Sequence, residues 1–582
     1  MTGPGGPARR AVPLAFVVAV LLALPSLTAP LLQDDVIHRG MLLDKAPGVH
    51  WGLFELYDFV GGPTRPASLM RERGLLPWFT DENLELRFFR PLSSAVLGMD
   101  ARLFEERTWL SRLHSLFWFL GILGLVTSLH RRFLSTSTAG VATLIYALSA
   151  GHALPVSWIA ARHALVCTAF SLLAFWLHLR AREDGWRPGR WLSPVAYAAG
   201  LLAGEMTLGA LAVIGAWEIF ARRDRIRERV VALAPLSSLT LVYLGSYVAM
   251  GYGARGSGAY TGLEAGLSGA LTVARHFLIL VGELVAATPS DAFGLATVRV
   301  QTSAALWGAT MAVVLLAVYR FARPHADPHE AAAMRWMPVA AAAAALPGAL
   351  ALVGGRVLTL ALFPAAGVMA VVLVRGAATV REEGVRTLAR AFMAVAIAGF
   401  ALGHFVTGPV LRAIIGFELA RLAREQHEQA ARMAPCLGVM VLVAAADPTI
   451  ATYVPATLAL RDRGPERLRV LSMAASNHRI DNVTRTGFDL TTPGSDRERS
   501  VWERLYRSGP LAAGTRVRVA GLDALVVEDR DGAPVRVRFD FSEPLDSAHL
   551  CLLQWRDGGI VPLLPPAPGE TMDLPHQPGP MR

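Results

Sequence analysis

The chain has 582 residues, of which 53% are hydrophobic and only 18% are charged, and its mean hydropathy is +0.41. Soluble domains carry about 25% charged residues, so this composition excludes a disordered, collagenous or ordinary soluble cytosolic chain. It predicts a polytopic α-helical membrane protein with a soluble part. The net charge of +10 is typical of arginine-rich cytoplasmic loops. No basic stretch is interleaved with aromatic residues, so we expect no nucleic-acid partner.

The first apolar run, 11–27, follows Arg9 and Arg10 and predicts an uncleaved signal anchor whose N-terminus is cytoplasmic. A spanning helix needs about 20 mostly apolar residues. Repeated runs of this kind predict about 11–13 membrane segments. The further runs lie near 109–129, 137–152, 163–179, 194–220, 230–250, 270–288, 302–320, 334–352, 357–374 and 391–410.

Two of these runs conflict with the topology that the arginine clusters indicate. The run 194–220 has cytoplasmic signals at both ends, so we expect two shortened helices that break near Gly204 and Glu205. For 270–288 we expect a re-entrant or interfacial pair in the outer leaflet. Irregular backbone at membrane depth is tolerated beside protein or a water-filled cavity, so both features indicate a polar cavity on the outer side.

The same topology predicts four parts. Residues 1–410 form the transmembrane domain, whose long first outer loop is 31–108. Residues 411–435 form an amphipathic linker helix on the outer face. Residues 436–575 alternate apolar and polar side chains between Gly and Pro positions, which predicts a small extracytoplasmic β-rich domain. Residues 576–582 form a loose tail.

The three cysteines, Cys167, Cys436 and Cys551, make neither a disulfide framework nor a zinc site. Cys436 and Cys551 can pair if their domain lies in an oxidising compartment. The alternative is two free thiols.

Two adjacent carboxylates, Asp34 and Asp35, follow the first span. Like charges at a membrane surface raise the pKa of one member of such a pair, which suits a general base or a metal ligand. The alternative is the solvated start of a loop. No further ligand set accompanies the pair, so we expect no cofactor, although these aspartates offer ligands to a divalent metal.

Cationic side chains recur at the predicted outer boundary, where each suits a phosphate group or, alternatively, simple interfacial anchoring. They are Arg90 before Pro91, the neighbours Arg162 and His163, and Arg356 after Gly354-Gly355. Glu205 is an intramembrane carboxylate, which is a functional candidate by default; its alternative role is a helix cap or an ion pair.

The order of these features resembles the GT-C superfamily of polyprenyl-phosphate-sugar-dependent glycosyltransferases, beginning with Leu31-Leu32-Gln33-Asp34-Asp35 after the first span. Further segments resemble the membrane half of the TPR-containing O-mannosyltransferases. In chain order these are Arg90-Pro91-Leu92 ("RPL"), His114, Val156–Arg162 ("AW-x-x-GR"), Ala203-Gly204-Glu205-Met206 ("SKE-x") and Gly355-Arg356-Val357 ("ERY"). The chain departs from that family where Gly204 replaces the Lys, where the Glu and Tyr beside Arg356 are missing, and where a β-rich domain replaces the TPR array.

The resemblance implies transfer of a sugar, with inversion, from a polyprenyl-phosphate donor to an acceptor hydroxyl on the extracytoplasmic side of a bacterial inner membrane. It implies Asp34 or Asp35 as general base, and Arg90, Arg162, His163 and Arg356 as donor-phosphate ligands. His114 and Glu205 would support them. The expected partners are the lipid-linked sugar, membrane lipid and an unidentified glycan, lipid or protein acceptor. The alternatives are a non-catalytic GT-C-like scaffold that displays the β domain, or a transporter of lipid-linked substrate, although the chain lacks the inverted repeats typical of transporters.

Overall fold

The computed structural model describes residues 7–260, 266–381, 387–436, 438–492 and 502–581. The chain folds as two compact units, each assembled from three segments that are separate in the sequence. Unit 1 comprises Met1–Thr28, Phe89–Met250 and Thr261–Ala420. Unit 2 comprises Ala29–Phe88, Gly251–Tyr260 and Arg421–Arg582.

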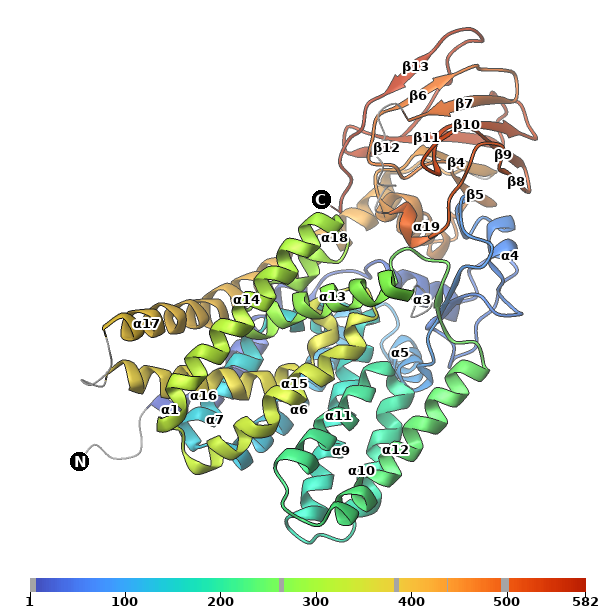
Figure 1. The fold of residues 1–582 in the computed structure, drawn as a ribbon. Coiled ribbons are helices and arrows are strands. Elements are labelled where there is room, and N and C mark those ends of the chain that lie inside the picture. The colour runs from blue at the N-terminus through green and yellow to red at the C-terminus, as the bar shows by residue number, and fades with distance from the viewer. Residues whose placement is uncertain (1–6, 261–265, 382–386, 437, 493–501, 582) are drawn as a thin grey trace. The chain divides into compact units, whose positions relative to one another are not determined.

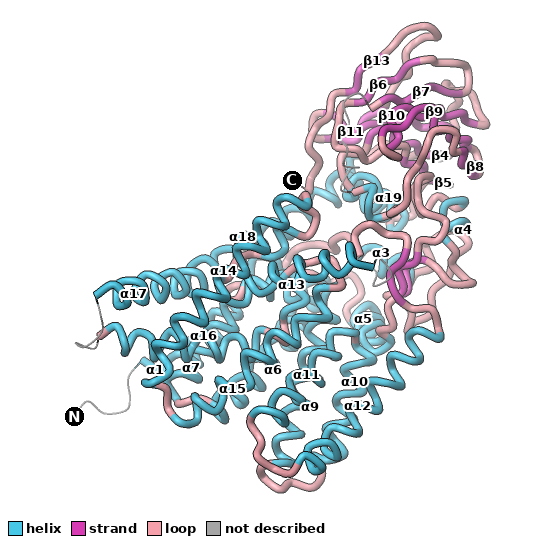
Figure 2. The backbone as a smooth tube through the Cα atoms, viewed as in Figure 1, coloured by secondary structure: helices cyan, strands magenta, loops and turns pink. Residues whose placement is uncertain are grey.

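Unit 1 is built almost entirely of helices (Figures 1 and 2), because a segment in lipid must satisfy its own backbone hydrogen bonds. Its helices are α1 (Pro7–Leu21), α2 (Leu24–Leu27), α5 (Pro91–Leu103), α6 (Thr108–Phe133), α7 (Thr136–Leu148), α8 (Ala153–Ser157), α9 (His163–Arg182), α10 (Gly189–Ala203), α11 (Leu208–Phe220), α12 (Ile226–Ala249), α13 (Gly266–Ala286), α14 (Val298–Ala322), α15 (Pro328–Ala349), α16 (Leu362–Val380), α17 (Thr387–Leu402) and α18 (Gly408–Arg432), which continues into unit 2.

Among the described residues, eight helices are long and apolar enough to cross a membrane, or nine if the bent pair α7 and α8 forms one span. The expected polytopic helical architecture is therefore confirmed. Eight is fewer than the 11–13 segments expected, in part because α10 and α11 have only 15 and 13 residues. The outer-face helix expected at 411–435 largely coincides with α18, which begins at Gly408 and ends at Arg432.

The two irregular runs have different outcomes. The predicted break at Gly204 and Glu205 is confirmed: α10 ends at Ala203, and the 3-10 turn η3 (Glu205–Thr207) precedes α11. A Cβ on Gly204 would lie 2.8 Å from the sulfur of Cys167, so this close approach requires glycine. The predicted pair at 270–288 is wrong, because α13 is one unbroken helix of 21 residues, a length of about 31 Å at 1.5 Å per residue.

An aromatic cluster forms the centre of unit 1. The ring of Phe175 on α9 lies 6.2 Å from Trp217, 5.7 Å from Trp336 and 6.1 Å from Phe363, which belong to α11, α15 and α16. Such pairs contribute about 0.5–1.5 kcal/mol each beyond the area they bury. The cluster therefore fixes four helices of unit 1 against one another.

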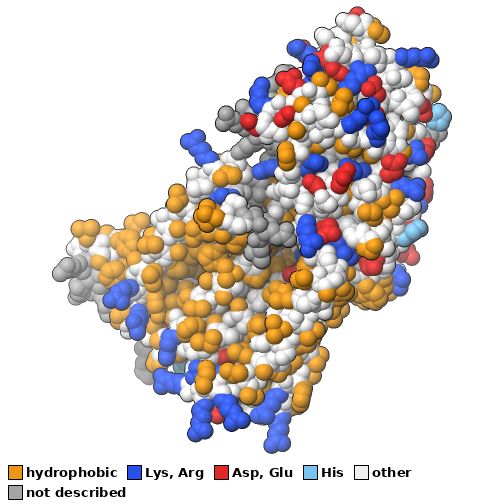
Figure 3. Space-filling model, turned by 45° about the vertical axis from the view of Figure 1, so that its right-hand side comes forward, with side chains coloured by type: hydrophobic (Ala, Val, Ile, Leu, Met, Phe, Trp, Pro, Cys, Tyr) orange, Lys and Arg blue, Asp and Glu red, His pale blue; other side chains and the backbone are white. Residues whose placement is uncertain are grey.

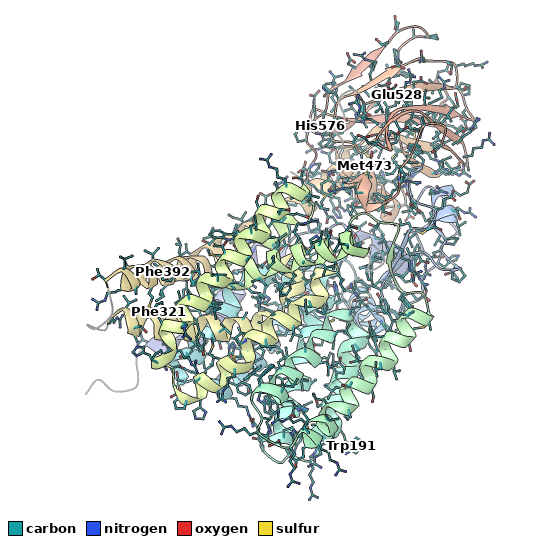
Figure 4. All side chains as sticks on the ribbon, in the orientation of Figure 1. Trp191, Phe321, Phe392, Met473, Glu528 and His576 are labelled. Carbon is teal, nitrogen blue, oxygen red and sulfur yellow. A yellow bond between two sulfur atoms is a disulfide. The ribbon has the colours of Figure 1, made fainter. Side chains whose placement is uncertain are left out.

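The outer surface of unit 1 is apolar, as expected for a lipid-facing surface. Hydrophobic side chains are spread over the helical face in Figure 3, and Lys and Arg side chains lie along its edges. Trp191, Phe321 and Phe392, labelled in Figure 4, lie on this surface and are 79%, 43% and 41% exposed. A contiguous exposed apolar surface on a protein indicates an interaction site, and for spanning helices that site is the membrane.

The described residues of unit 2 form three sheets. Its strands are β1 (Asp58–Val60), β2 (Glu85–Arg87), β3 (Gly253–Arg255), β4 (Val439–Ala444), β5 (Arg467–Val470), β6 (His478–Asp481), β7 (Gly487–Thr491), β8 (Arg516–Val519), β9 (Leu522–Arg530), β10 (Ala533–Phe541), β11 (Leu550–Arg556), β12 (Gly559–Pro562) and β13 (Met572–Leu574). The strand orders are β1-β2-β3, β13-β6-β7-β10-β9-β8 and β12-β11-β4-β5. The expected period-two pattern is confirmed in β10, where every second side chain is buried.

The first outer loop belongs to the same core as the C-terminal strands. Trp78 is 4% exposed, its indole N–H donates to the carbonyl of Leu471 over 2.9 Å, and its ring lies 5.5 Å from Phe539. In addition, Cys436 and Cys551 form a disulfide. Of the two alternatives for these cysteines, the structure has the bonded pair.

Candidate functional site

The two predicted catalytic aspartates open helix α3 (Asp34–Leu42) of unit 2, and the structure distinguishes them. Asp35 is 4% exposed, and its Oδ2 accepts the backbone N–H of Leu32 over 3.1 Å. Asp34 is half-buried, and its Oδ1 accepts a hydrogen bond from the hydroxyl of Tyr453 over 2.9 Å. Asp35 therefore binds the backbone at the start of the helix. Asp34 instead binds the side chain of Tyr453.

The surroundings of Asp34 in unit 2 are aromatic and polar. The Tyr506 hydroxyl and the Thr452 hydroxyl lie 3.2 Å apart, beside Tyr453. Burial, followed by the nearby charge of Asp34, raises the pKa of Tyr453 well above its ordinary value. The phenol therefore stays protonated and remains a hydrogen-bond donor at neutral pH. His38, one helical turn after Asp34, is buried between aromatic rings, 5.4 Å from Phe59.

Arg90 and Glu205, two of the predicted residues of unit 1, form an ion pair. Arg90 precedes Pro91, and its Nε donates to Glu205 Oε2 over 2.9 Å. The other carboxylate oxygen of Glu205 accepts from the Tyr247 hydroxyl of α12 over 3.2 Å. The two side chains are 15% and 23% exposed. The broken helix thus brings a carboxylate to the guanidinium at the end of the first outer loop.

Arg162 and His114 share a second polar network in unit 1. Arg162 is 1% exposed; its Nη1 pairs with Asp100, and its Nε donates to the Ser115 hydroxyl over 2.8 Å. Asp100 also lies 2.7 Å from Nδ1 of His114, whose Nε2 accepts the indole N–H of Trp118 over 3.0 Å. The charge of a buried arginine is costly unless it is paired. Asp100, which the sequence analysis did not name, supplies that pairing.

His163 stands apart from this network although it is next to Arg162 in sequence. It begins α9, it is half-buried, and its Nδ1 lies 3.2 Å from the carbonyl of Ala160. The adjacent side chains therefore have different environments, one inside the helical unit and one near its surface.

Arg356 lies beside a pair of carboxylates that sequence reasoning missed. It is half-buried in the 3-10 turn η7 (Gly355–Leu358), where the Gly355 N–H donates to Asp291 over 3.0 Å. Burial raises the pKa of Asp291, and the opposing effect of the Arg356 charge is smaller. Glu283 is 2% exposed and accepts the N–H of Ser290 over 3.0 Å. A Cβ on Gly355 would lie 2.6 Å from Glu283 and 3.0 Å from Asp291, so both carboxylates pack against this glycine.

An apolar groove of about 330 Å³ lies between α6 and α9 in unit 1. Phe117, Trp118, Phe170 and Leu173 line its sides, and His114 of the Asp100 network contributes a polar edge. The groove therefore places hydrocarbon-compatible walls next to a buried charged network.

Within unit 1 the structure thus brings Arg90 to Glu205 and Arg162 to His114. Asp34 and Asp35 belong to unit 2, so the predicted meeting of aspartates and arginines stays a prediction. Throughout the described residues, no group of three or more His, Cys, Asp or Glu side chains is arranged to hold a metal ion.

Comparisons with known proteins add a distant likeness. No protein-family model and no curated protein matches the chain. Among solved structures, it resembles the oligosaccharyltransferase AglB of Archaeoglobus fulgidus in complex with an inhibitory peptide and a dolichol-phosphate, with 13% identity and a TM-score of 0.38 over 81% of this chain and 65% of that one. The apo form of the Archaeoglobus fulgidus oligosaccharyltransferase gives 12% identity, a TM-score of 0.37, and coverage of 79% and 64%. The chain thus spans less than two thirds of each neighbour, and a likeness at this level does not define its function.

Proposed function

We propose that this protein is a GT-C-type membrane glycosyltransferase that moves a sugar from a polyprenyl-phosphate donor to an acceptor hydroxyl on the extracytoplasmic side. The observation that carries the proposal is Asp34, a half-buried carboxylate directly after the first span, held by a tyrosine hydroxyl. A carboxylate in such a setting suits a general base. The ordered motifs that resemble the GT-C family support the same assignment.

The proposed reaction inverts the anomeric carbon. The acceptor oxygen attacks that carbon, the bond from the carbon to the phosphate oxygen breaks, and the acceptor proton passes to Asp34. Polyprenyl phosphate leaves with the electron pair of the broken bond. Negative charge develops on the leaving phosphate, and preorganised cations stabilise it.

Three of the predicted residues are assigned to that phosphate: the arginines Arg90 and Arg356, with His163 as a helper. Each is half-buried, which suits a group that meets a headgroup at the lipid boundary. Arg162 is assigned a different part, because it is 1% exposed and enclosed by Asp100 and Ser115, whereas the ion pair of Arg90 with Glu205 stays partly exposed. It holds His114 and the edge of the α6–α9 groove, which we assign to the apolar chain of the donor.

The orientation rests on the disulfide. Disulfides persist in oxidising compartments and are rare in the cytosol, so the bond between Cys436 and Cys551 supports an extracytoplasmic unit 2. Arginine-rich loops at the predicted cytoplasmic ends of the spans support the same topology.

The proposal is tested by donor turnover in a matched pair of variants. Release of polyprenyl phosphate is measured for the purified wild type, Asp34→Asn and Asp35→Asn with candidate lipid-linked sugars. We expect Asp34→Asn to lose about 10²-fold or more, and Asp35→Asn to keep most activity because an amide oxygen still accepts the Leu32 N–H. Equal turnover by the wild type and Asp34→Asn would refute the mechanism. A wild type that cleaves no donor would favour the scaffold.

A further inference from the structure

The C-terminal part of unit 2 contributes a side chain directly to Asp34. Tyr453 ends a π-helical turn, η9 (Thr449–Tyr453), that opens α19 (Val454–Leu460). π-Helical turns are rare and occur frequently at functional sites. The hydroxyl of Tyr453 reaches Oδ1 of Asp34 over 2.9 Å, although the two residues are 419 positions apart.

This turn is anchored on both sides, so the hydroxyl has a defined position. Asp447 is 1% exposed and accepts the N–H groups of Thr449 over 2.8 Å and Ile450 over 3.3 Å. On the following turn, the Thr457 hydroxyl donates to the carbonyl of Tyr453 over 2.7 Å. These bonds hold the backbone of the turn that carries Tyr453, and a functional side chain is positioned more precisely when it stands on a fixed backbone element.

We propose that Tyr453 is a positioning residue for the reaction, whose hydroxyl fixes the carboxylate of Asp34 and holds it in the charged form that accepts the acceptor's proton. This inference rests on the proposed function. An ionised carboxylate can only accept hydrogen bonds, and a donor to it favours the charged form. The raised pKa of the phenol, caused by burial and by Asp34, keeps the donor proton in place.

A wider consequence concerns the C-terminal region. Because Tyr453 of its turn η9 contacts Asp34, this region does more than display a β domain. It takes part in setting the state of the proposed base. Deleting it would therefore remove a catalytic support as well as a β domain.

The test compares Tyr453→Phe with Tyr506→Phe in the full-length protein. Both remove one hydroxyl and keep the ring, but the Tyr506 hydroxyl has Thr452 as its partner, at 3.2 Å. A hydrogen bond to a charged group corresponds to a factor of about ten or more. We expect Tyr453→Phe to lower kcat/KM about ten-fold or more and to move the acidic limb of its pH profile to higher pH. Tyr506→Phe should leave that limb in place.

The outcomes separate the two proposals. An unchanged rate and limb in folded Tyr453→Phe, with Asp34→Asn inactive, would overturn the positioning role and leave the base assignment intact. Full activity in Asp34→Asn would instead overturn the proposed function. If Tyr453→Phe does not fold, 3,5-difluorotyrosine is placed at position 453 instead. Its hydroxyl is a stronger hydrogen-bond donor, so the acidic limb of the pH profile should move to lower pH. An unchanged acidic limb would contradict the inference.

Discussion

Replacing Asp100 by asparagine removes the negative charge that faces Arg162 inside unit 1. The two side chains are 3% and 1% exposed, so the arginine would stay buried without a counter-charge. Breaking a buried pair in this way costs about 3–5 kcal/mol. We therefore expect Asp100→Asn to lower the free energy of unfolding of the helical unit by about that amount, measured by thermal and denaturant unfolding in detergent micelles.

The matched control is Glu183→Gln, which weakens the pair between Arg132 and Glu183. The nitrogen and oxygen of that pair lie 2.6 Å apart, but its side chains are 24% and 30% exposed. Such pairs contribute about 0–1 kcal/mol. The double variant Asp100→Leu/Arg162→Met should recover most of the lost stability, because apolar replacements of a buried pair are often neutral. If Asp100→Asn costs no more than Glu183→Gln, the account of this network is incorrect.

Two further predictions concern unit 2. Burial lowers the pKa of His478 from 6.5 to about 4, so the folded state binds its proton less readily than the unfolded state does. The free energy of unfolding therefore falls by up to about 3 kcal/mol as the pH is lowered from 6.5 to 4. Urea unfolding of the wild type and of His478→Gln at several pH values checks this. The same pH dependence of the unfolding free energy in both proteins would contradict it. Without reductant, the denatured chain should react with maleimide at one thiol, Cys167, and after reduction it should react at three. Reduction should also destabilise unit 2 by about 2–5 kcal/mol. Three reactive thiols before reduction would show that Cys436 and Cys551 are not bonded.

Local rules in the sequence predicted the helical membrane fold well. Apolar length identified most of the spans, and the arginines flanking 194–220 required the break that the structure places at Gly204. The period-two pattern likewise predicted the strands near β10, because the alternation of buried and exposed side chains is set by neighbouring residues along the chain. The prediction of a re-entrant pair at α13 was wrong. It came from assigning the ends of successive spans to alternate sides of the membrane, where one misplaced span requires an irregular segment elsewhere.

Contacts between distant segments could not be predicted. Trp78 contacts Leu471, 393 positions away, and Phe539, which is farther still along the chain, so part of the first outer loop belongs to the C-terminal core. Tyr453 meets Asp34 over a similar separation. Asp100 carried no signal of its own, because it lies within the predicted outer loop 31–108, where a single aspartate is typical of a solvated position. A buried arginine expected at Arg162 would have required such a partner.

The most direct test of the proposed function is an experimental structure of the protein with a bound polyprenyl-phosphate sugar. The account predicts the phosphate within hydrogen-bonding distance of Arg90 or Arg356, with the anomeric carbon beside the Asp34 carboxylate and the lipid chain in the α6–α9 groove. A donor phosphate bound away from both arginines, or an Asp34 carboxylate on the opposite side of the membrane from the sugar, would contradict it.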